Sequence, residues 1–127
     1  MAIVNISTVS DADFNRAFAY KVQSDPNDAS SLIPFDLTGS TLVMGVRKNA
    51  EDKDEVLLLT SDVQDGGINI FDAEHGLFYV TIKQTFLLNL VPGIYVHSLV
   101  RLMRYRDQDF RYRIWSGTLT HVIGPSR

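Results

Sequence analysis

The sequence contains no cysteine, and this absence excludes several classes of protein. Disulfide frameworks, thiolate zinc sites and thiol catalysis all require that residue. No apolar run approaches the roughly 18 residues that a membrane-spanning helix needs. The N-terminal segment lacks a basic stretch followed by a long apolar run, so we expect no secretory signal. These absences predict a soluble protein with no membrane partner.

The chain also lacks an excess of positive charge. Its 12 basic and 15 acidic residues give a formal net charge of −3, which argues against a general role in binding nucleic acid. Hydrophobic residues make up 45% of the 127 residues, and this is enough for one core without help from metals or disulfides. We therefore predict a single domain over residues 1–127, with the core in 2–123 and a short tail at 124–127.

No segment of ten or more residues sustains the apolar stripe of an amphipathic helix, whereas alternating segments are frequent. The central stretch contains two of them, residues 68–71 and 77–83, joined by a polar turn that ends in Gly76; this pattern predicts a β-hairpin. Helical spacing follows at Phe86, Leu87 and Leu90, so we predict one short helical turn near residues 84–90, ended by Pro92.

Further strands are predicted on both sides of this stretch, because apolar and polar residues alternate there as well. The expected ranges are 2–9, 14–22, 41–47, 56–60, 94–104 and 110–123. About eight strands separated by turn residues predict an all-β protein, a single antiparallel β-sandwich of immunoglobulin-like or jelly-roll-like type.

Residues suited to catalysis or metal binding are present but not grouped. The three histidines, His75, His97 and His121, show no metal-ligand spacing, and there is no GxSxG nucleophile motif. The carboxylates of residues 51–55 share a loop with lysines, which is typical of a solvated surface. The acidic turn at 62–67 lacks the full ligand series of a calcium loop. We predict no catalytic residue, no metal and no cofactor, hence a protein that is not an enzyme and has no small-molecule ligand.

The least uniform feature of the sequence is a cluster of arginine and aromatic residues in the predicted hairpin from 101 to 115. Such a mixture is typical of protein interfaces and also of surfaces that bind single-stranded nucleic acid. A third interpretation is a solvated hairpin whose arginines pair with Asp107 and Asp109. We predict a protein interface that meets acidic residues of a neighbouring copy, because two aspartates cannot neutralise five arginines. The predicted interface residues are Arg101, Arg104, Tyr105, Arg106, Arg111, Tyr112, Arg113 and Trp115.

Several blocks of sequence occur in the order found in one family of phage proteins. The blocks are residues 13–21, 35–41 with its DLTG turn, 67–78, 90–95 and 117–122. With these blocks the chain resembles small β-sandwich proteins associated with the tails and baseplates of phages and prophages, in particular the N-terminal domain of upper-baseplate proteins. The resemblance implies a non-enzymatic virion protein, assembled in the cytoplasm of a bacterial host, that acts as a scaffold in the tail, baseplate or neck.

The same resemblance implies two kinds of protein partner, other virion structural proteins and further copies of the chain in a symmetric ring. A different class of function, a carbohydrate-binding or surface-binding module, would use Tyr105, Tyr112 and Trp115 as a platform for stacking. The burial of Trp115 distinguishes the two, because a buried indole favours a scaffold and an exposed aromatic row favours ligand binding.

Overall fold

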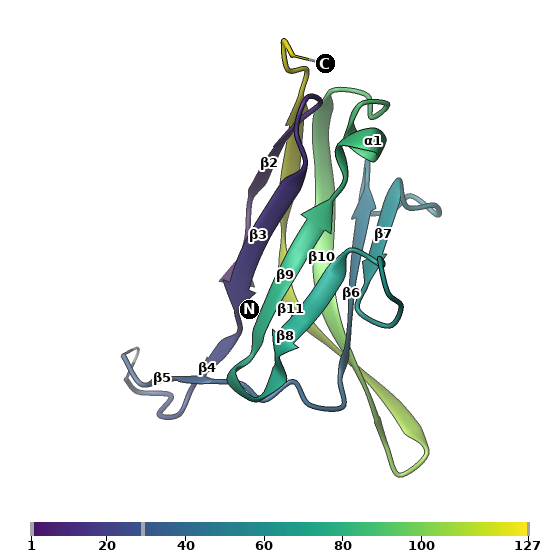
Figure 1. The fold of residues 1–127 in the computed structure, drawn as a ribbon. Helices are drawn as coiled ribbons and strands as arrows, with labels where there is room; N and C mark the ends of the chain where they lie inside the picture. Colours follow the sequence, from purple (N-terminus) through teal and green to yellow (C-terminus); the bar gives the residue numbers. More distant parts are fainter. Residues whose placement is uncertain (1, 29, 127) are drawn as a thin grey trace.

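Two β-sheets pack face to face in the computed structural model, which describes residues 2–28 and 30–126 (Figure 1). The predicted all-β sandwich is therefore confirmed. Met1 and Arg127, the two ends of the predicted domain, lie outside the described residues, as does Ala29. The strands of the larger sheet are β1 (Ala2–Ile3), β2 (Ile6–Val9), β6 (Thr41–Arg47), β7 (Leu57–Thr60), β10 (Gly93–Tyr105) and β11 (Gln108–Val122). The smaller sheet contains β3 (Phe14–Ala19), β8 (Ile68–Asp72) and β9 (Leu77–Ile82), and β4 (Lys21–Gln23) pairs with β5 (Leu32–Pro34) in a separate ribbon.

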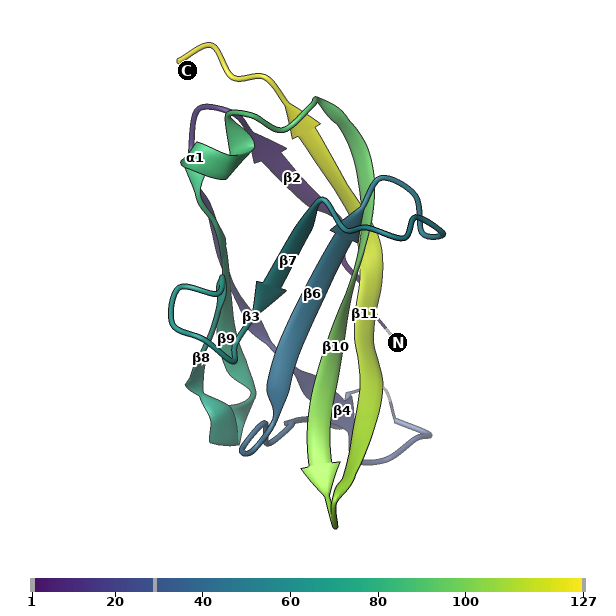
Figure 2. The same cartoon turned by 90° about the vertical axis from the view of Figure 1, so that its right-hand side faces the viewer.

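The larger sheet is built around the long hairpin of β10 and β11, which Figure 2 shows beside β6 and β7. The strand order is β1-β11-β10-β6-β7, and β2 also pairs with β11. Both β1 and β2 run parallel to β11, so the sheet is mixed and the prediction of a purely antiparallel sandwich is corrected here. Eleven strands are formed among the described residues rather than about eight, because the segments 2–9 and 14–22 each divide into two and β5 was not among the predicted strands.

A glycine explains how the N-terminal segment comes so close to β11. The backbone N–H of Val4 donates a hydrogen bond to the carbonyl of Ser116 over 2.9 Å. A Cβ atom at Gly117 would overlap the carbonyl of Val4, so only glycine permits this approach. The Asn5 side chain accepts hydrogen bonds from the backbone N–H of Thr118 at 3.2 Å and from its hydroxyl at 3.1 Å. These bonds fix the break between β1 and β2.

The core lies between the two sheets and is centred on aromatic rings. Phe78 of the smaller sheet is fully buried, and its ring stacks on Trp115 of the larger sheet with the centroids 5.9 Å apart. Phe18 contacts the same indole at 4.6 Å. Tyr95 is also buried. Trp115 is only 4% exposed, which is the outcome stated above to favour a scaffold. It is a core residue, and the prediction that it belongs to an interface or stacking platform is corrected.

A β-bulge in β11 decides which side chains of the hairpin share a face. Leu99 pairs with Trp115, but the next residue, Val100, pairs with Arg113, so Ile114 is an extra residue. Beyond the bulge, Tyr112 points to the same side of the sheet as Trp115. Simple alternation along an unbroken strand would place Tyr112 and Trp115 on opposite faces, but the extra residue reverses the alternation.

The predicted helical turn is confirmed as α1 (Gln84–Leu87), and a single 3₁₀ turn, η1 (Ala73–His75), joins β8 to β9. The backbone N–H of Gln84 donates a 2.6 Å hydrogen bond to the carboxylate of Asp13, which fixes the start of α1 against the smaller sheet. Leu87, the last residue of α1, is fully buried. Within the described residues, none of the helices is long and apolar enough to cross a membrane.

Candidate functional site: the arginine-aromatic hairpin

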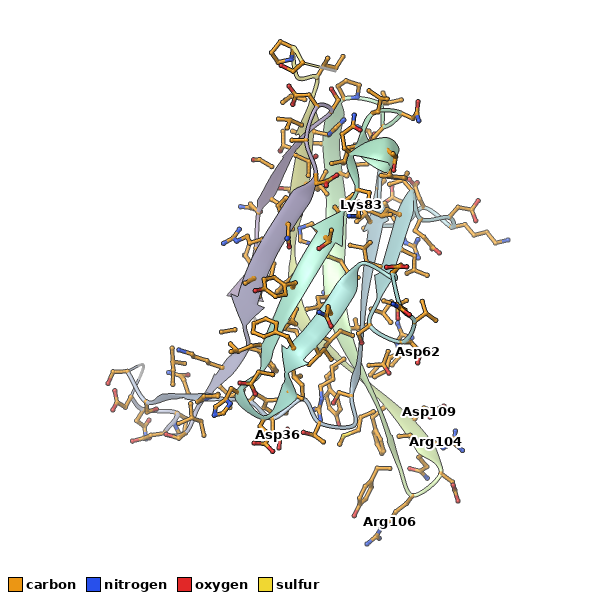
Figure 3. All side chains as sticks on the ribbon, viewed as in Figure 1. Asp36, Asp62, Lys83, Arg104, Arg106 and Asp109 are labelled. Atoms are coloured by element: carbon orange, nitrogen blue, oxygen red, sulfur yellow. The ribbon has the colours of Figure 1, made fainter. Side chains whose placement is uncertain are left out.

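The distal part of the β10–β11 hairpin, residues 101–113, projects beyond the end of the sandwich, and Figure 3 shows Arg104, Arg106 and Asp109 there. We call this segment the arginine-aromatic hairpin. Its two-residue turn is formed by Arg106 and Asp107, whose φ angles are 51° and 61°. Positive φ at both central residues defines a type I′ turn, which normally contains asparagine or glycine. Arginine at the first position is therefore locally unfavourable.

One face of this hairpin is aromatic and continues the core face of the sheet. The Arg101 guanidinium lies over the ring of Phe35, 4.6 Å from its centroid, and 5.7 Å from that of Tyr112. Its Nε donates a 2.7 Å hydrogen bond to the hydroxyl of Ser40, so the side chain is held in place. Phe110 stacks beside Tyr112 with the rings 6.5 Å apart and 15° from parallel. Arg101 therefore joins the hairpin to the end of the sandwich.

The aromatic side chains nearest the tip are left uncovered. Tyr105 is 55% exposed and Tyr112 50% exposed, although both rings are large and apolar. The Arg106 guanidinium lies 5.2 Å from the ring centroid of Tyr105. Aromatic residues and arginine are enriched in the cores of protein interfaces relative to the rest of the surface.

The opposite face of the hairpin is basic. Arg104 lies 3.5 Å from Asp109 and 3.9 Å from Asp107, and all three side chains are well exposed. Exposed ion pairs of this kind contribute about 0–1 kcal/mol each, because water screens them. Arg111 and Arg113 are exposed as well, and among the described residues neither forms an ion pair. The predicted pairing of the arginines within the hairpin is thus limited to Arg104.

The charge of the chain is unevenly distributed because of this hairpin. Residues 101–113 hold five of the 12 basic residues and two of the 15 acidic residues, so the hairpin carries a formal +3 and the rest of the chain −6. Among the acidic residues outside it, Figure 3 labels Asp36 and Asp62. A positive projection on an acidic body favours a partner of negative charge.

The structure brings seven of the eight predicted interface residues together on the hairpin and separates Trp115 from them. It adds two aromatic residues that the prediction omitted. Phe110 lies within the hairpin, and its aromatic character was a sufficient signal. Phe35 belongs to the segment before β6, 66 residues before Arg101 in the chain, and no local pattern links the two.

The described residues contain no cluster of three or more histidine, aspartate or glutamate side chains placed to hold a metal ion. His75 and Asp72 form a surface pair at 2.9 Å, and the hydrogen bond from this carboxylate raises the pKa of His75. His97 is buried beside Trp115, whose Nε1 donates to its Nδ1 at 3.3 Å, and burial lowers its pKa. The third histidine, His121, does contact a hydroxyl: its Nδ1 lies 2.8 Å from Oγ1 of Thr8, and both side chains are buried in the sandwich.

Comparison with known proteins finds no matching family model and no matching curated protein. Among solved structures, the chain is similar to AggA, the major subunit of aggregative adherence fimbriae type I from Escherichia coli. The match has 14% sequence identity and a TM-score of 0.34, and it covers 93% of this chain and 89% of AggA. AggA is a fimbrial subunit rather than an enzyme. A likeness at this level does not indicate which residues of this chain bind a partner.

The predicted relationship to phage tail and baseplate proteins is wrong, because no family model supports it and the similar structure is a fimbrial subunit. The predicted virion location and the predicted role as a virion scaffold rested on this relationship, so they are wrong as well. The blocks that suggested them reflect general turn chemistry. In the DLTG block, the carboxylate of Asp36 accepts a 2.8 Å hydrogen bond from the N–H of Thr38, and Gly39 has φ 77°. Many β-sandwiches use such turns.

Proposed function

We propose that this chain is a non-enzymatic, surface-binding β-sandwich module that contacts its partner through the arginine-aromatic hairpin. The observation that carries the proposal is the uncovered aromatic face at the tip, with Tyr105 and Tyr112 about half exposed beside Arg106. Aromatic rings and arginine contribute most of the binding energy in many interfaces.

The turn residues support the same proposal. Arg106 occupies a backbone position with φ 51° that asparagine or glycine would adopt with less strain. A side chain kept in an unfavourable backbone conformation suggests a function for that side chain. At the tip, the guanidinium of Arg106 is available both for stacking and for a bidentate contact with a carboxylate.

An acidic protein surface is the partner class that the charge distribution favours. We propose that such partners include other copies of the chain, because the body of the molecule is itself acidic. Repeated copy-to-copy contacts build either a closed ring or an open polymer. The symmetric ring expected from the sequence is one of these two outcomes, and the mass of the native protein distinguishes them.

A carbohydrate surface is a second candidate, favoured by one specific observation. The rings of Phe110 and Tyr112 lie only 15° from parallel and form a short aromatic platform. Such a platform can stack on sugar rings, whose C–H faces are apolar. In this alternative the platform consists of Tyr105, Phe110 and Tyr112, since Trp115 is buried.

The proposal is tested by binding the protein to a sensor coated with polyglutamate and to an array of neutral and acidic glycans. The test variants are Arg104→Glu/Arg106→Glu and Tyr105→Ser/Tyr112→Ser. A matched control, Lys21→Glu/Lys53→Glu, makes the same charge change at exposed residues outside the hairpin.

We expect the parent and the control to bind at least one of these surfaces, and both hairpin variants to bind at least tenfold more weakly with unchanged melting temperatures. Binding to polyglutamate supports an acidic protein partner, and binding to glycans alone supports the carbohydrate candidate. Equal binding by the parent and both hairpin variants would overturn the proposal.

A further inference from the structure

The outer face of the larger sheet contains a groove. It lies on the opposite side of the sheet from the aromatic face of the hairpin. Its volume is about 570 Å³, which is within the range of clefts that take small ligands. The groove crosses the strands rather than following one. Its lining includes Gly45, Ser98, Ser116, Val43, Val96 and Val100.

Strand register explains why the sheet is hollow at this point. Ser98 of β10 lies between Ser116 of β11 and Gly45 of β6, so three adjacent strands present their smallest side chains in one row. The same row ends at Ile3 of β1 and at Leu58 of β7, which are 76% and 53% exposed. A floor of small residues between two large apolar side chains makes a depression with apolar walls.

Arginines form the charged part of the lining. Arg111 and Arg113 come from the basic face of the hairpin, and Arg47 comes from β6. Arg47 is paired with Glu55 at 2.7 Å, whereas neither of the other two forms an ion pair among the described residues. The groove therefore offers apolar area and two uncompensated positive charges to one ligand.

The loop from Ser61 to Gly66, between β7 and β8, has complementary chemistry. Val63 is 58% exposed, and it lies between Asp62 and Asp65, whose side chains are exposed and form no ion pair among the described residues. The loop is already ordered by its own backbone: the N–H of Gly66 donates to the carbonyl of Val63 at 3.1 Å, and the N–H of Thr60 donates to the carbonyl of Gly66 at 2.8 Å. A preformed loop loses little entropy on binding.

We propose that the 61–66 loop of one copy docks in the outer groove of a second copy. Val63 would enter the depression between its apolar walls, and Asp62 and Asp65 would meet Arg111 and Arg113. No residue lines both the groove and the pocket around the loop, so one molecule presents both surfaces at once.

Because the two surfaces differ, the contact is heterologous, and each copy can bind one neighbour on either side. This inference rests on the self-association in the proposed function and names the surfaces that carry it. It uses the basic face of the hairpin and leaves the aromatic face free for another partner.

The test uses two complementary variants of the full chain. Arg111→Glu/Arg113→Glu removes the groove's charge and keeps the loop, and Asp62→Asn/Asp65→Asn removes the loop's charge and keeps the groove. Asparagine tolerates the φ of 63° at Asp65, so the loop backbone is preserved. The matched controls are Lys21→Glu/Lys53→Glu for the arginines and Glu51→Gln/Asp54→Asn for the aspartates, all at exposed residues.

Sedimentation velocity over a wide concentration range then gives the oligomeric state. We expect the parent and both controls to form concentration-dependent oligomers, and each groove or loop variant alone to associate at least tenfold more weakly. A mixture of the two variants should give a 1:1 dimer and nothing larger, because only the intact loop of one can enter the intact groove of the other.

A mixture that stays monomeric would overturn this inference, and so would a loop variant that assembles as the parent does. The tyrosine variant Tyr105→Ser/Tyr112→Ser separates it from the proposed surface binding. That variant should assemble normally while losing retention on the coated surfaces. If it loses both properties, the aromatic face carries self-association and the groove does not.

Discussion

At the residue scale, the environment of His97 determines how the core responds to pH. Nδ1 accepts a hydrogen bond from the Trp115 indole, and Nε2 donates to the carbonyl of Thr118 at 3.2 Å. Both nitrogens form these hydrogen bonds only when the ring is neutral, because a proton on Nδ1 would face the indole N–H. Burial acts in the same direction and lowers the pKa of His97 from its usual 6.5.

The first prediction concerns the stability contributed by neutral His97. With a lowered folded pKa, the unfolded chain binds the proton first as the pH falls below about 6.5. The stability that neutral His97 contributes is therefore fully present above that pH, and it is lost as the pH falls toward the pKa of the folded state. The variant His97→Gln, whose amide can keep both hydrogen bonds, should lack this decrease.

Urea denaturation at pH 5 to 8, followed by the fluorescence of the single tryptophan, measures both proteins. His75 is present in each and has a raised pKa, so its opposite contribution cancels in the comparison. Parallel pH profiles for the two proteins would contradict the assignment of a neutral, buried His97.

At the element scale, the arginine-aromatic hairpin shows where local patterns succeed and fail. The sequence predicted a hairpin with five arginines among aromatic residues, and the structure forms it. Alternation alone could not assign the faces, because the extra residue at Ile114 reverses the pattern between Arg113 and Trp115. The small-residue row of the outer groove was equally hidden, since it depends on the register of strands that are distant in sequence.

The second prediction concerns the turn of this hairpin. Replacing Arg106 and Asp107 by asparagine and glycine relieves two positive-φ residues, because both replacements favour that region. We expect the free energy of unfolding to rise by about 0.5–1 kcal/mol, in the range of other backbone-relieving substitutions. Retention on the coated surfaces should fall, because the Arg106 guanidinium is lost.

Denaturant midpoints and the same binding assay check the two parts of this prediction. A gain in stability without a loss of binding would show that Arg106 has no part in recognition. A loss of stability would show that the turn is not strained.

At the scale of the whole molecule, the fold class could be predicted from composition and alternation. The strand order could not, because it depends on contacts between residues that are distant in the chain. Alternating segments with few helix signals were enough to predict a sandwich. The parallel docking of β1 and β2 against β11 depends on the single missing side chain at Gly117, more than 100 residues away in the chain. The family resemblance was wrong for the related reason that its blocks were turns and short strands, which reflect general β-sandwich chemistry.

The central claim is that the hairpin tip binds a partner and the sandwich supports it. The decisive variant replaces residues 104–109 by Asn-Gly, which joins Met103 to Phe110. Those two residues are paired in the ladder, two residue pairs before the Tyr105–Gln108 pair that closes the present turn, so the hydrogen-bonding pattern is kept. The deletion removes two arginines and two aspartates, so the net charge stays the same.

Binding of the shortened and parent proteins to the same coated surfaces, with melting temperatures measured in parallel, tests the claim directly. We predict equal melting temperatures within a few degrees, because the removed side chains are exposed, and a loss of binding of at least tenfold. Undiminished binding by the shortened protein would contradict the account.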